Sequence, residues 1–395
     1  MITSSLFIEE QQLFKRKKVL EKVRKIGEEV IGEYAQKVDF EQRYPFESIE
    51  SLRSQNLQVL SVPTSYGGLG AGFKGDLVLL PLVLMEIASW CSSSSQVFAL
   101  HNSAVQFIHA FGTDEQKDFF FNEIKNGAFL GSFGSEANPD GVIKNKLTPV
   151  ENGFLLNGEK VFATGSPGAK WAIWRAVYED PTKTNGEPFA LPLVDLSSQG
   201  IEIIDNWDGM GQRGTGSGKV IAKDVFIDKR FILANGISYQ NYDSFFSSLF
   251  HVNFAAQFVG IAKGAFREAK QYVKKYIKDA SNDPIIQLRV GELSAKIKAA
   301  EQITIYAANK LHDFNFNNEN SDEIVLAAAQ AKVISTETVL DVTNKIFQVM
   351  GARSATNENG FDLYYRNART LTLHDRVDRQ SQLAGKIELD ELEKD

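Results

Sequence analysis

The hydrophobic period of this chain changes twice, and that order restricts the folds open to it. Residues 6–38 place apolar side chains at helical spacing, and further helical segments follow them. From 128 to 235 the chain has short alternating runs rich in Val, Ile, Phe, Thr and Gly, which predict strands. The helical period returns near residue 239 and continues to the end. We therefore predict an α+β protein made of three segments, which are residues 1–126, 127–236 and 237–395.

Local signals within these segments predict individual elements. Thr113 and Gln116 have the spacing of a capping box at the start of a helix. Asn-Gly pairs at 152–153 and 157–158 are typical of hairpin turns. No strand leads through a GxGxxG motif into a crossover helix, which argues against a Rossmann nucleotide site. The helices expected after residue 239 are 241–280, 284–314, 322–351, 361–375 and 380–393.

Composition argues against several classes of protein. The 395 residues carry a net charge of −7, and the basic run KRKK at 15–18 lies among apolar and acidic residues, which argues against nucleic-acid binding. The single cysteine, Cys91, excludes an intramolecular disulfide and any Cys-rich metal site. There is no run of 18 apolar residues and no leader-like start. We therefore expect no membrane span and a cytoplasmic location.

The five histidines do not predict a metal site. They stand at 101, 109, 251, 312 and 374, and none has HxxxH or ExxH spacing. Serine hydrolase chemistry is also disfavoured, because GTGSGK at 214–219 is neither a GxSxG elbow nor a phosphate-binding P-loop. These observations leave no metal and no nucleophile to propose.

Three loops rich in small polar residues remain as candidates for ligand binding. They read GSFGSE at 131–136, FATGS at 162–166 and GQRGTGSGK at 211–219. Hydroxyls and exposed backbone N–H groups can bind a planar ligand that carries phosphate. Turns in any β-domain need glycine as well, so the loops alone leave both interpretations open.

Four longer motifs resemble the acyl-CoA dehydrogenase superfamily in order and spacing. They are FGTDEQKDFFFNEIKNGAFLGSFGSE (111–136), NGFLLNGEKVFATGS (152–166), WDGMGQRGTGSGKVIAKDVFI (207–227) and QVMGARSA (348–355). The resemblance implies an N-terminal helical domain, a central antiparallel β-domain and a C-terminal four-helix bundle. It also implies a flavin, FAD or FMN, bound between the subunits of a homo-oligomer, for which we expect a tetramer.

The same resemblance assigns residues to the flavin. Ser135 and Thr164 are expected to contact the isoalloxazine ring, with Phe162 packed against it. Ser166 and Arg213 belong to the same loops and are expected near the cofactor. Gln348 and Gly351 are expected beside the dinucleotide half of a flavin bound mainly by the neighbouring subunit.

Departures from the dehydrogenases point to one branch of the superfamily. The P-G-A-G-S-D loop of dehydrogenases is replaced by SEANPDG at 135–141, and Asp375 stands where they commonly have a catalytic Glu. The stretches KVFATG, GQRGTGSG and YRNARTLTLHD instead resemble reduced-flavin-dependent monooxygenases similar to those that act on dibenzothiophene and sulfones. That branch normally continues LHDPV-x-YK, whereas this chain reads LHDRVDRQ.

Three functions follow as alternatives. In a monooxygenase of a small apolar or sulfur-containing substrate, His374 would serve the oxygen chemistry, His101 would face the pocket, and a separate flavin reductase would supply reduced flavin. In an acyl-CoA dehydrogenase, Asp375 would be the base and an electron-transfer flavoprotein the partner. A scaffold that has lost its flavin is the third. The motifs favour the first.

Overall fold

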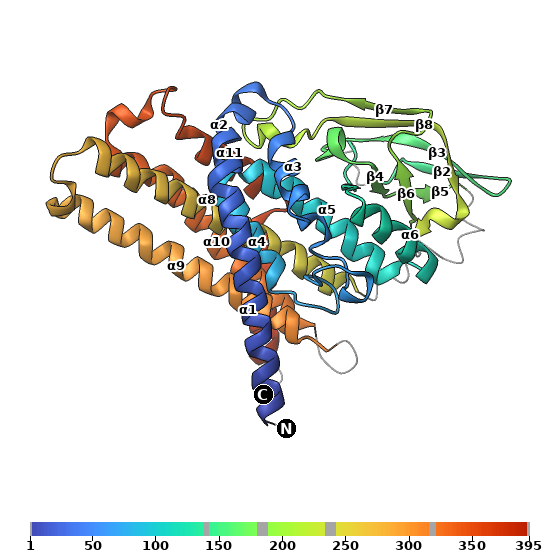
Figure 1. The fold of residues 1–395 in the computed structure, drawn as a ribbon, viewed down its shortest axis with the longest axis horizontal. Helices are drawn as coiled ribbons and strands as arrows, with labels where there is room; N and C mark the ends of the chain where they lie inside the picture. Colours follow the sequence, from blue (N-terminus) through green and yellow to red (C-terminus); the bar gives the residue numbers. More distant parts are fainter. Residues whose placement is uncertain (1, 138–141, 180–188, 234–241, 316–320, 393–395) are drawn as a thin grey trace.

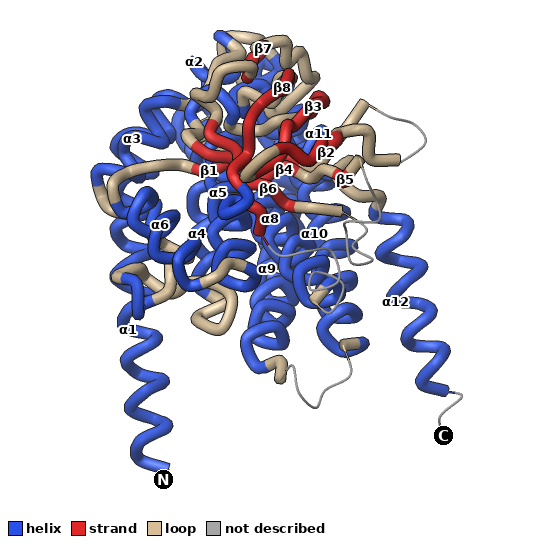
Figure 2. The backbone as a smooth tube through the Cα atoms, turned by 90° about the vertical axis from the view of Figure 1, so that its right-hand side faces the viewer, coloured by secondary structure: helices blue, strands red, loops and turns tan. Residues whose placement is uncertain are grey.

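The helix–strand–helix order of the sequence is the architecture of the protein. The computed structural model describes residues 2–137, 142–179, 189–233, 242–315 and 321–392. The long helices gather on one side and the sheets on the other (Figure 1). Both termini lie at the same end of the molecule, where α1 and α12 extend beyond the body (Figures 1 and 2).

The N-terminal segment is helical as predicted. Helices α1 and α2 are continuous apart from a π-turn between them. At this turn Trp90 packs against Gly27 and Gly32. The capping box is confirmed, because Thr113 and Gln116 bond reciprocally at the start of α6. The helices of this segment are α1 (Ile2–Ile26), η1 (Gly27–Ile31), α2 (Gly32–Glu41), α3 (Phe46–Ser54), α4 (Leu79–Trp90), α5 (Ser92–Phe111) and α6 (Asp114–Lys125).

The central segment forms two sheets packed face to face. Their strand orders are β1-β4-β6-β9 and β5-β2-β3-β8-β7. The predicted antiparallel β-domain is confirmed for most strand pairs, but β1 pairs with β4 and β2 with β5 in parallel. The strands are β1 (Leu130–Phe133), β2 (Lys146–Val150), β3 (Gly153–Lys160), β4 (Trp171–Trp174), β5 (Val177–Tyr178), β6 (Leu191–Asp195), β7 (Ile201–Ile204), β8 (Lys219–Asp228) and β9 (Ile232–Leu233).

The two Asn-Gly pairs have different structures. Asn152, with a φ of 62°, lies in the turn of the β2–β3 hairpin, where Val150 pairs with Gly153, as predicted. The pair at 157–158 is instead a bulge within β3, so the hairpin prediction is wrong there. Gly158 is required because a Cβ would lie 2.3 Å from the Asn145 Oδ1 atom. A bulge of this kind turns the strand toward the loop that follows it.

The C-terminal segment is the predicted helical bundle, and a helix of the N-terminal segment joins it. Helices α8, α9 and α10 pack along one another, and α11 and α12 pack on α10. Helix α4 also packs along α8, so the two helical segments share a core. The bundle helices are α8 (Asp243–Tyr276), α9 (Pro284–Asp313), α10 (Asp322–Met350), α11 (Asp362–Thr372) and α12 (Val377–Leu392).

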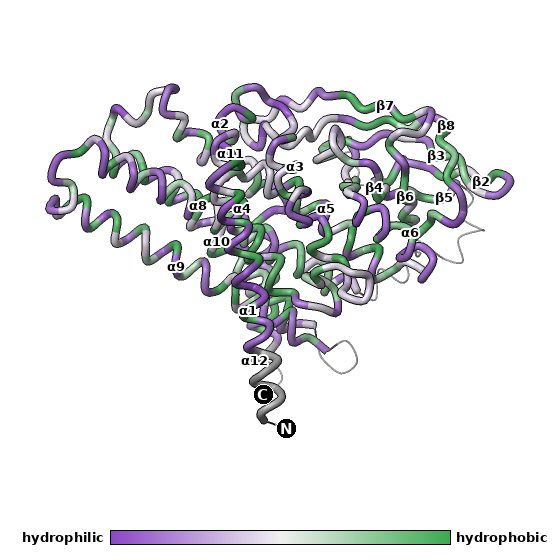
Figure 3. Tube along the Cα trace, viewed as in Figure 1, coloured by the Kyte–Doolittle hydropathy of each residue, from purple (hydrophilic) through white to green (hydrophobic). Residues whose placement is uncertain are grey.

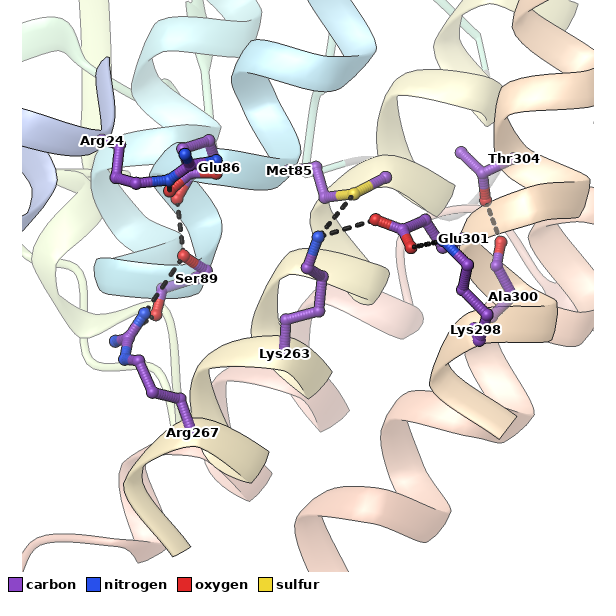
Figure 4. Close-up of polar contacts among 10 residues, drawn as sticks. All are labelled: Arg24, Met85, Glu86, Ser89, Lys263, Arg267, Lys298, Ala300, Glu301 and Thr304. Carbon is purple, nitrogen blue, oxygen red and sulfur yellow. Dashed lines mark hydrogen bonds and ion pairs between the residues drawn. The ribbon is translucent and has the colours of Figure 1, made fainter. Parts of the chain in front are cut away.

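Two glycines one turn apart bring α8 against α4. A Cβ at Gly260 would lie 2.4 Å from the Met85 carbonyl oxygen, and one at Gly264 would lie 2.2 Å from that of Ser89. Polar contacts flank this crossing in Figure 4. The Lys263 ammonium lies 2.7 Å from the Glu301 carboxylate of α9 and contacts the Met85 sulfur of α4. The backbones therefore touch, with little side-chain volume between them.

Apolar residues concentrate where α4, α5, α8 and α10 cross in the centre (Figure 3). Within the described residues, α8 alone is long and apolar enough to cross a membrane. Since 83% of its apolar window is buried inside the protein, α8 has the character of a core helix.

Candidate active site

Three loops at one end of the β-domain meet, and they are the three that the sequence singled out. The Val161 N–H donates to the Ser135 carbonyl oxygen at 3.2 Å, and the Gly165 N–H donates to that of Thr215 at 2.9 Å. The Thr164 hydroxyl lies 2.7 Å from the Ser217 hydroxyl, which lies 2.6 Å from that of Thr215. The structure thus brings the loops that carry Ser135, Thr164 and Arg213 into one surface.

Phe162 is presented outward at the end of β3. Its side chain is 60% exposed and packs edge-on against Trp207, with 5.7 Å between ring centroids. Its φ of 53° is rare for an aromatic residue and costs on the order of 1 kcal/mol or more. The exposed Phe162 ring and the neighbouring Trp207 indole together offer a surface that suits a planar ligand.

The remaining loop residues differ in what they present. The Ser135 side chain is exposed, whereas Ser166 is buried and its hydroxyl is 3.4 Å from the Gly216 carbonyl oxygen. Ser166 therefore joins the two loops from their buried side and is not presented to a ligand. Arg213, at the start of η6 (Arg213–Thr215), is half-buried, and its guanidinium has no ion pair with any described residue. A cation without an ion pair among the described residues, in the same surface as the exposed Ser135, suits a phosphate-bearing ligand.

A buried ion pair anchors the first loop. Lys160, at the end of β3, is fully buried and lies 2.7 Å from the Glu136 carboxylate, which also accepts from the Lys144 N–H. Burial lowers the pKa of Lys160 to about 8, although Glu136 opposes that shift. Burial alone would raise the pKa of Glu136, but Lys160 holds it below its ordinary value. The pair fixes the residue that follows Ser135.

Helix α11 connects these loops to the His-Asp pair. The Gln212 N–H donates to the Asn367 side chain at 2.6 Å, and Gly211 packs on the Arg366 carbonyl group. Beyond Asn367 the helix runs for about 7.5 Å, at 1.5 Å per residue, to its end at Thr372, and His374 follows two residues later. Helix α5 supports the other side, since Ser92 accepts from Gln212 and Val97 contacts Gly165.

His374 follows the end of α11 and packs against α8. Its ring stacks on Phe254 of α8, with 4.3 Å between centroids. The His374 residue is exposed to solvent, although protein atoms still crowd its ring closely enough to desolvate it. This desolvation, with the nearby Lys332 ammonium, lowers the pKa of His374 to about 4. The imidazole is therefore neutral at physiological pH, and neither ring nitrogen bonds to a described residue.

One carboxylate oxygen of Asp375 is contacted by three other side chains. Its Oδ2 atom lies 2.7 Å from His251 Nε2, 3.0 Å from Gln380 Nε2 and 3.5 Å from Lys332 Nζ. Burial would raise the pKa of Asp375, but Lys332 and His251 outweigh it and keep the pKa below the ordinary value. The carboxylate is thus ionised, and three donors surround its Oδ2 atom.

The prediction that His101 faces the pocket is contradicted by the structure. The side chain is completely buried. Its Nε2–H donates to the Gln58 carbonyl oxygen at 2.7 Å, and its Nδ1 accepts from the Leu130 N–H at 3.1 Å. His101 instead joins α5 to β1 and to the loop before α4, and burial lowers its pKa to about 4.

Gln348 and Gly351 lie at the far end of the bundle from the β-domain. Gln348 is exposed and accepts a hydrogen bond from Arg289, and Gly351, with a φ of 80°, has open space around it. They do not meet the loop residues within one chain. Their expected contact with a flavin bound to a neighbouring subunit stays a prediction.

Some predicted features fall outside what the structure describes or add nothing to the site. The replaced loop SEANPDG is described only as far as Ala137. Cys91 is buried, which raises the pKa of its thiol. No group of three metal-ligating side chains occurs among the described residues.

Sequence reasoning missed Lys332, His251, and the pair Glu136–Lys160. A signal existed for Lys332, because the helical neighbours Ala328, Ala329, Ser335 and Thr336 are small and place the lysine on the buried face of α10.

An exposed aromatic platform, hydroxyl-bearing loops and an unpaired arginine fit a flavin, and comparison with known proteins agrees. The chain matches the family model for the acyl-CoA dehydrogenase N-terminal domain over residues 14–128 and the model for its C-terminal domain over 252–379. The protein therefore belongs to the acyl-CoA dehydrogenase superfamily and is a flavin-dependent oxidoreductase.

Several similar proteins within the superfamily are monooxygenases. Dibenzothiophene monooxygenase from Rhodococcus erythropolis is 28% identical over 361 residues, or 85% of each chain. TdsC from Paenibacillus sp. A11-2, solved with FMN and indole, is 26% identical with a TM-score of 0.86, and the match covers 95% of this chain and 97% of TdsC. Methanesulfinate monooxygenase MsuC from Pseudomonas fluorescens is 25% identical with a TM-score of 0.85, over 94% and 97% of the two chains.

Proposed function

We propose that this protein is a monooxygenase that uses reduced flavin and O2 to oxygenate a small apolar substrate. Phe162 and Trp207 would face the flavin ring, Ser135 and Thr164 would hydrogen-bond to it, and Arg213 would pair with its phosphate. Bound reduced flavin would supply the electrons and the position at which O2 reacts. The residues of the chain would bind it, exclude water and place a proton donor beside it.

The observation that carries the proposal is the contrast between His374 and Asp375. A dehydrogenase needs a carboxylate that is free to take an α-proton and has a raised pKa. Asp375 has three donors around one oxygen and a lowered pKa. His374 is neutral and has both ring nitrogens available, so it can donate one hydrogen bond and accept another.

Aromatic residues near His374 support an apolar substrate. Helices α5 and α8 enclose a narrow hollow, one helical turn from Phe254, which stacks on His374. Three phenyl rings line it, and Gln106 and Asn253 each bring a buried amide atom that has no partner among the described residues. The hollow is lined by Ser103, Gln106, Phe107, Phe246, Leu249, Phe250 and Asn253. These walls suit an apolar molecule with one polar atom, but the hollow is too narrow in this structure to hold even a water molecule, so its side chains would have to move to admit a substrate.

The proposal has consequences for partners and assembly. A separate flavin reductase would deliver FMNH2 or FADH2. A homotetramer would bring Gln348 and Gly351 of one subunit to the flavin of another, which would give these exposed residues a function.

Rapid mixing of the reduced-flavin complex with O2 tests the proposal without knowledge of the substrate. Absorbance should pass through a distinct species that decays much more slowly than reduced flavin reoxidises in buffer. Direct return to the spectrum of oxidised flavin would refute the proposal and favour the dehydrogenase. In that case the Asp375→Asn variant should fail to reduce flavin with an acyl-CoA that reduces the wild type.

A further inference from the structure

Lys332 is a completely buried lysine whose three N–H donors all point to one turn. It lies in α10 and donates to the carbonyl oxygens of His374 at 2.9 Å and of Asp375 at 3.0 Å. Its third contact is the Asp375 carboxylate at 3.5 Å. An ammonium group has three donors and no acceptor, so these contacts use its full capacity.

The turn that Lys332 contacts has an unfavourable backbone. Asp375 has a φ of 55°, in the left-handed region that a residue other than glycine adopts at a cost. This conformation ends α11 and directs both carbonyl oxygens toward α10, where the lysine receives them. Without the ammonium group, two carbonyl oxygens and one carboxylate oxygen would lose a donor, and the turn would lose its main constraint.

Other groups complete the network around the lysine. His251 of α8 and Gln380 of α12 donate to the same carboxylate oxygen of Asp375. The Lys332 ammonium also lies 5.6 Å from the centre of the Phe254 ring, on which His374 stacks. Three helices thus fix the turn, and the lysine is the member that holds the backbone.

We propose that Lys332 is a positioning residue that sets the place of the His374 imidazole in the active site. The proposal rests on the proposed function, because it takes His374 as the group that serves the reaction. The lysine acts through the backbone of the turn, and it does not touch the flavin or the substrate. A lysine that merely stabilised the junction of α11 and α12 would affect folding but not the place of the ring.

The Lys332→Met variant tests this with a signal that does not depend on turnover. In apo-protein labelled with 13C at histidine, the ring protons of His374 should be shifted by the ring current of Phe254. Loss of positioning should move this resonance toward the value of a free histidine. The pKa of His374 should also rise toward its ordinary value, because a nearby positive charge that lowers it is gone. Asp375 and His251 are the other charged or titratable groups near the ring, and neither is substituted in this variant.

The Lys263→Met variant is the matched control. It also removes a partly buried lysine with a carboxylate partner from the bundle, at the α4–α8–α9 contact in Figure 4. It should leave the His374 resonance unchanged. If the Lys332→Met chain does not fold, the double variant Lys332→Met, Asp375→Asn removes both charges and carries the same measurement.

Turnover distinguishes this proposal from the proposed function. With the relatives' substrates, kcat of the Lys332→Met variant should fall on the order of 100-fold, since a displacement of about 1 Å costs that much, while KM stays within a few-fold. An unmoved His374 resonance and unchanged kcat would overturn the positioning role. If the wild type shows no oxygen chemistry but the resonance still moves in Lys332→Met, the proposed function fails and the positioning of the ring stands.

Discussion

Acid should destabilise this protein through His101, and the size of the effect follows from the burial of its ring. Its Nδ1 accepts from the Leu130 N–H, so a proton on Nδ1 would set two donors against each other in a fully buried position. Burial, which penalises the charged imidazole, holds the pKa of His101 near 4 in the folded protein, against 6.5 when unfolded. Between these values the unfolded chain binds more protons, so stability falls as the pH falls from 6.5 toward 4.

The magnitude can be worked out for one condition. With these two pKa values, the share of unfolding free energy lost through His101 between pH 7 and pH 4.5 is about 2 to 3 kcal/mol. The His101→Gln variant cannot titrate there, although its amide can still donate and accept. It should be less stable than the wild type at pH 7 but should lose about 2 to 3 kcal/mol less on acidification.

Urea unfolding at the two pH values, followed by circular dichroism, measures this difference. The comparison is between changes within each protein, so the cost of the substitution itself cancels. Equal losses in the wild type and in His101→Gln would refute the reasoning, because they would mean that this histidine does not change its protonation on unfolding.

Three further outcomes are expected. His374→Ala should lower kcat at least 100-fold while the flavin Kd, measured by fluorescence, stays within a few-fold; wild-type turnover would rule out its role. Lys160→Met leaves a buried carboxylate unpaired, so it should lower the free energy of unfolding in urea by about 3 to 5 kcal/mol and weaken flavin binding. The control Lys219→Met removes a more exposed ion pair and should lower it by under about 1 kcal/mol. Gly264→Ala should destabilise by about 1 to 3 kcal/mol through its clash with α4, and Gly291→Ala, in open space on α9, should stabilise by about 0.5 to 1 kcal/mol; a shared sign in thermal or urea unfolding would contradict the packing argument.

Local features were predictable from the sequence, since their partners lie close in the chain. Thr113 and Gln116 are three residues apart and formed the expected capping box. The dipeptide Asn157-Gly158 has the same letters as Asn152-Gly153, yet it became a bulge. Its structure is decided by the distant strand β8, where Asp224 exchanges hydrogen bonds with Asn157.

The candidate site shows the same limit. The loop residues were found because motifs mark them, and the structure brings them together. His101 and His374 could not be separated by sequence, because the partners that define His101, Gln58 and Leu130, lie 43 and 29 residues away. The importance of Lys332 could not be predicted, because the turn that it contacts lies more than 40 residues later in the chain.

The touching backbones of α4 and α8 restrict how the protein can move. Hinge closure between domains requires an interface that can open or slide. Here the carbonyl groups of α4 lie directly against Gly260 and Gly264 of α8, a helix that runs through the bundle. Sliding by even a fraction of a turn would drive neighbouring side chains into that helix. The two helical segments therefore behave as one rigid body. A substrate would therefore enter by rearrangement of side chains and loops, not by separation of these two helices.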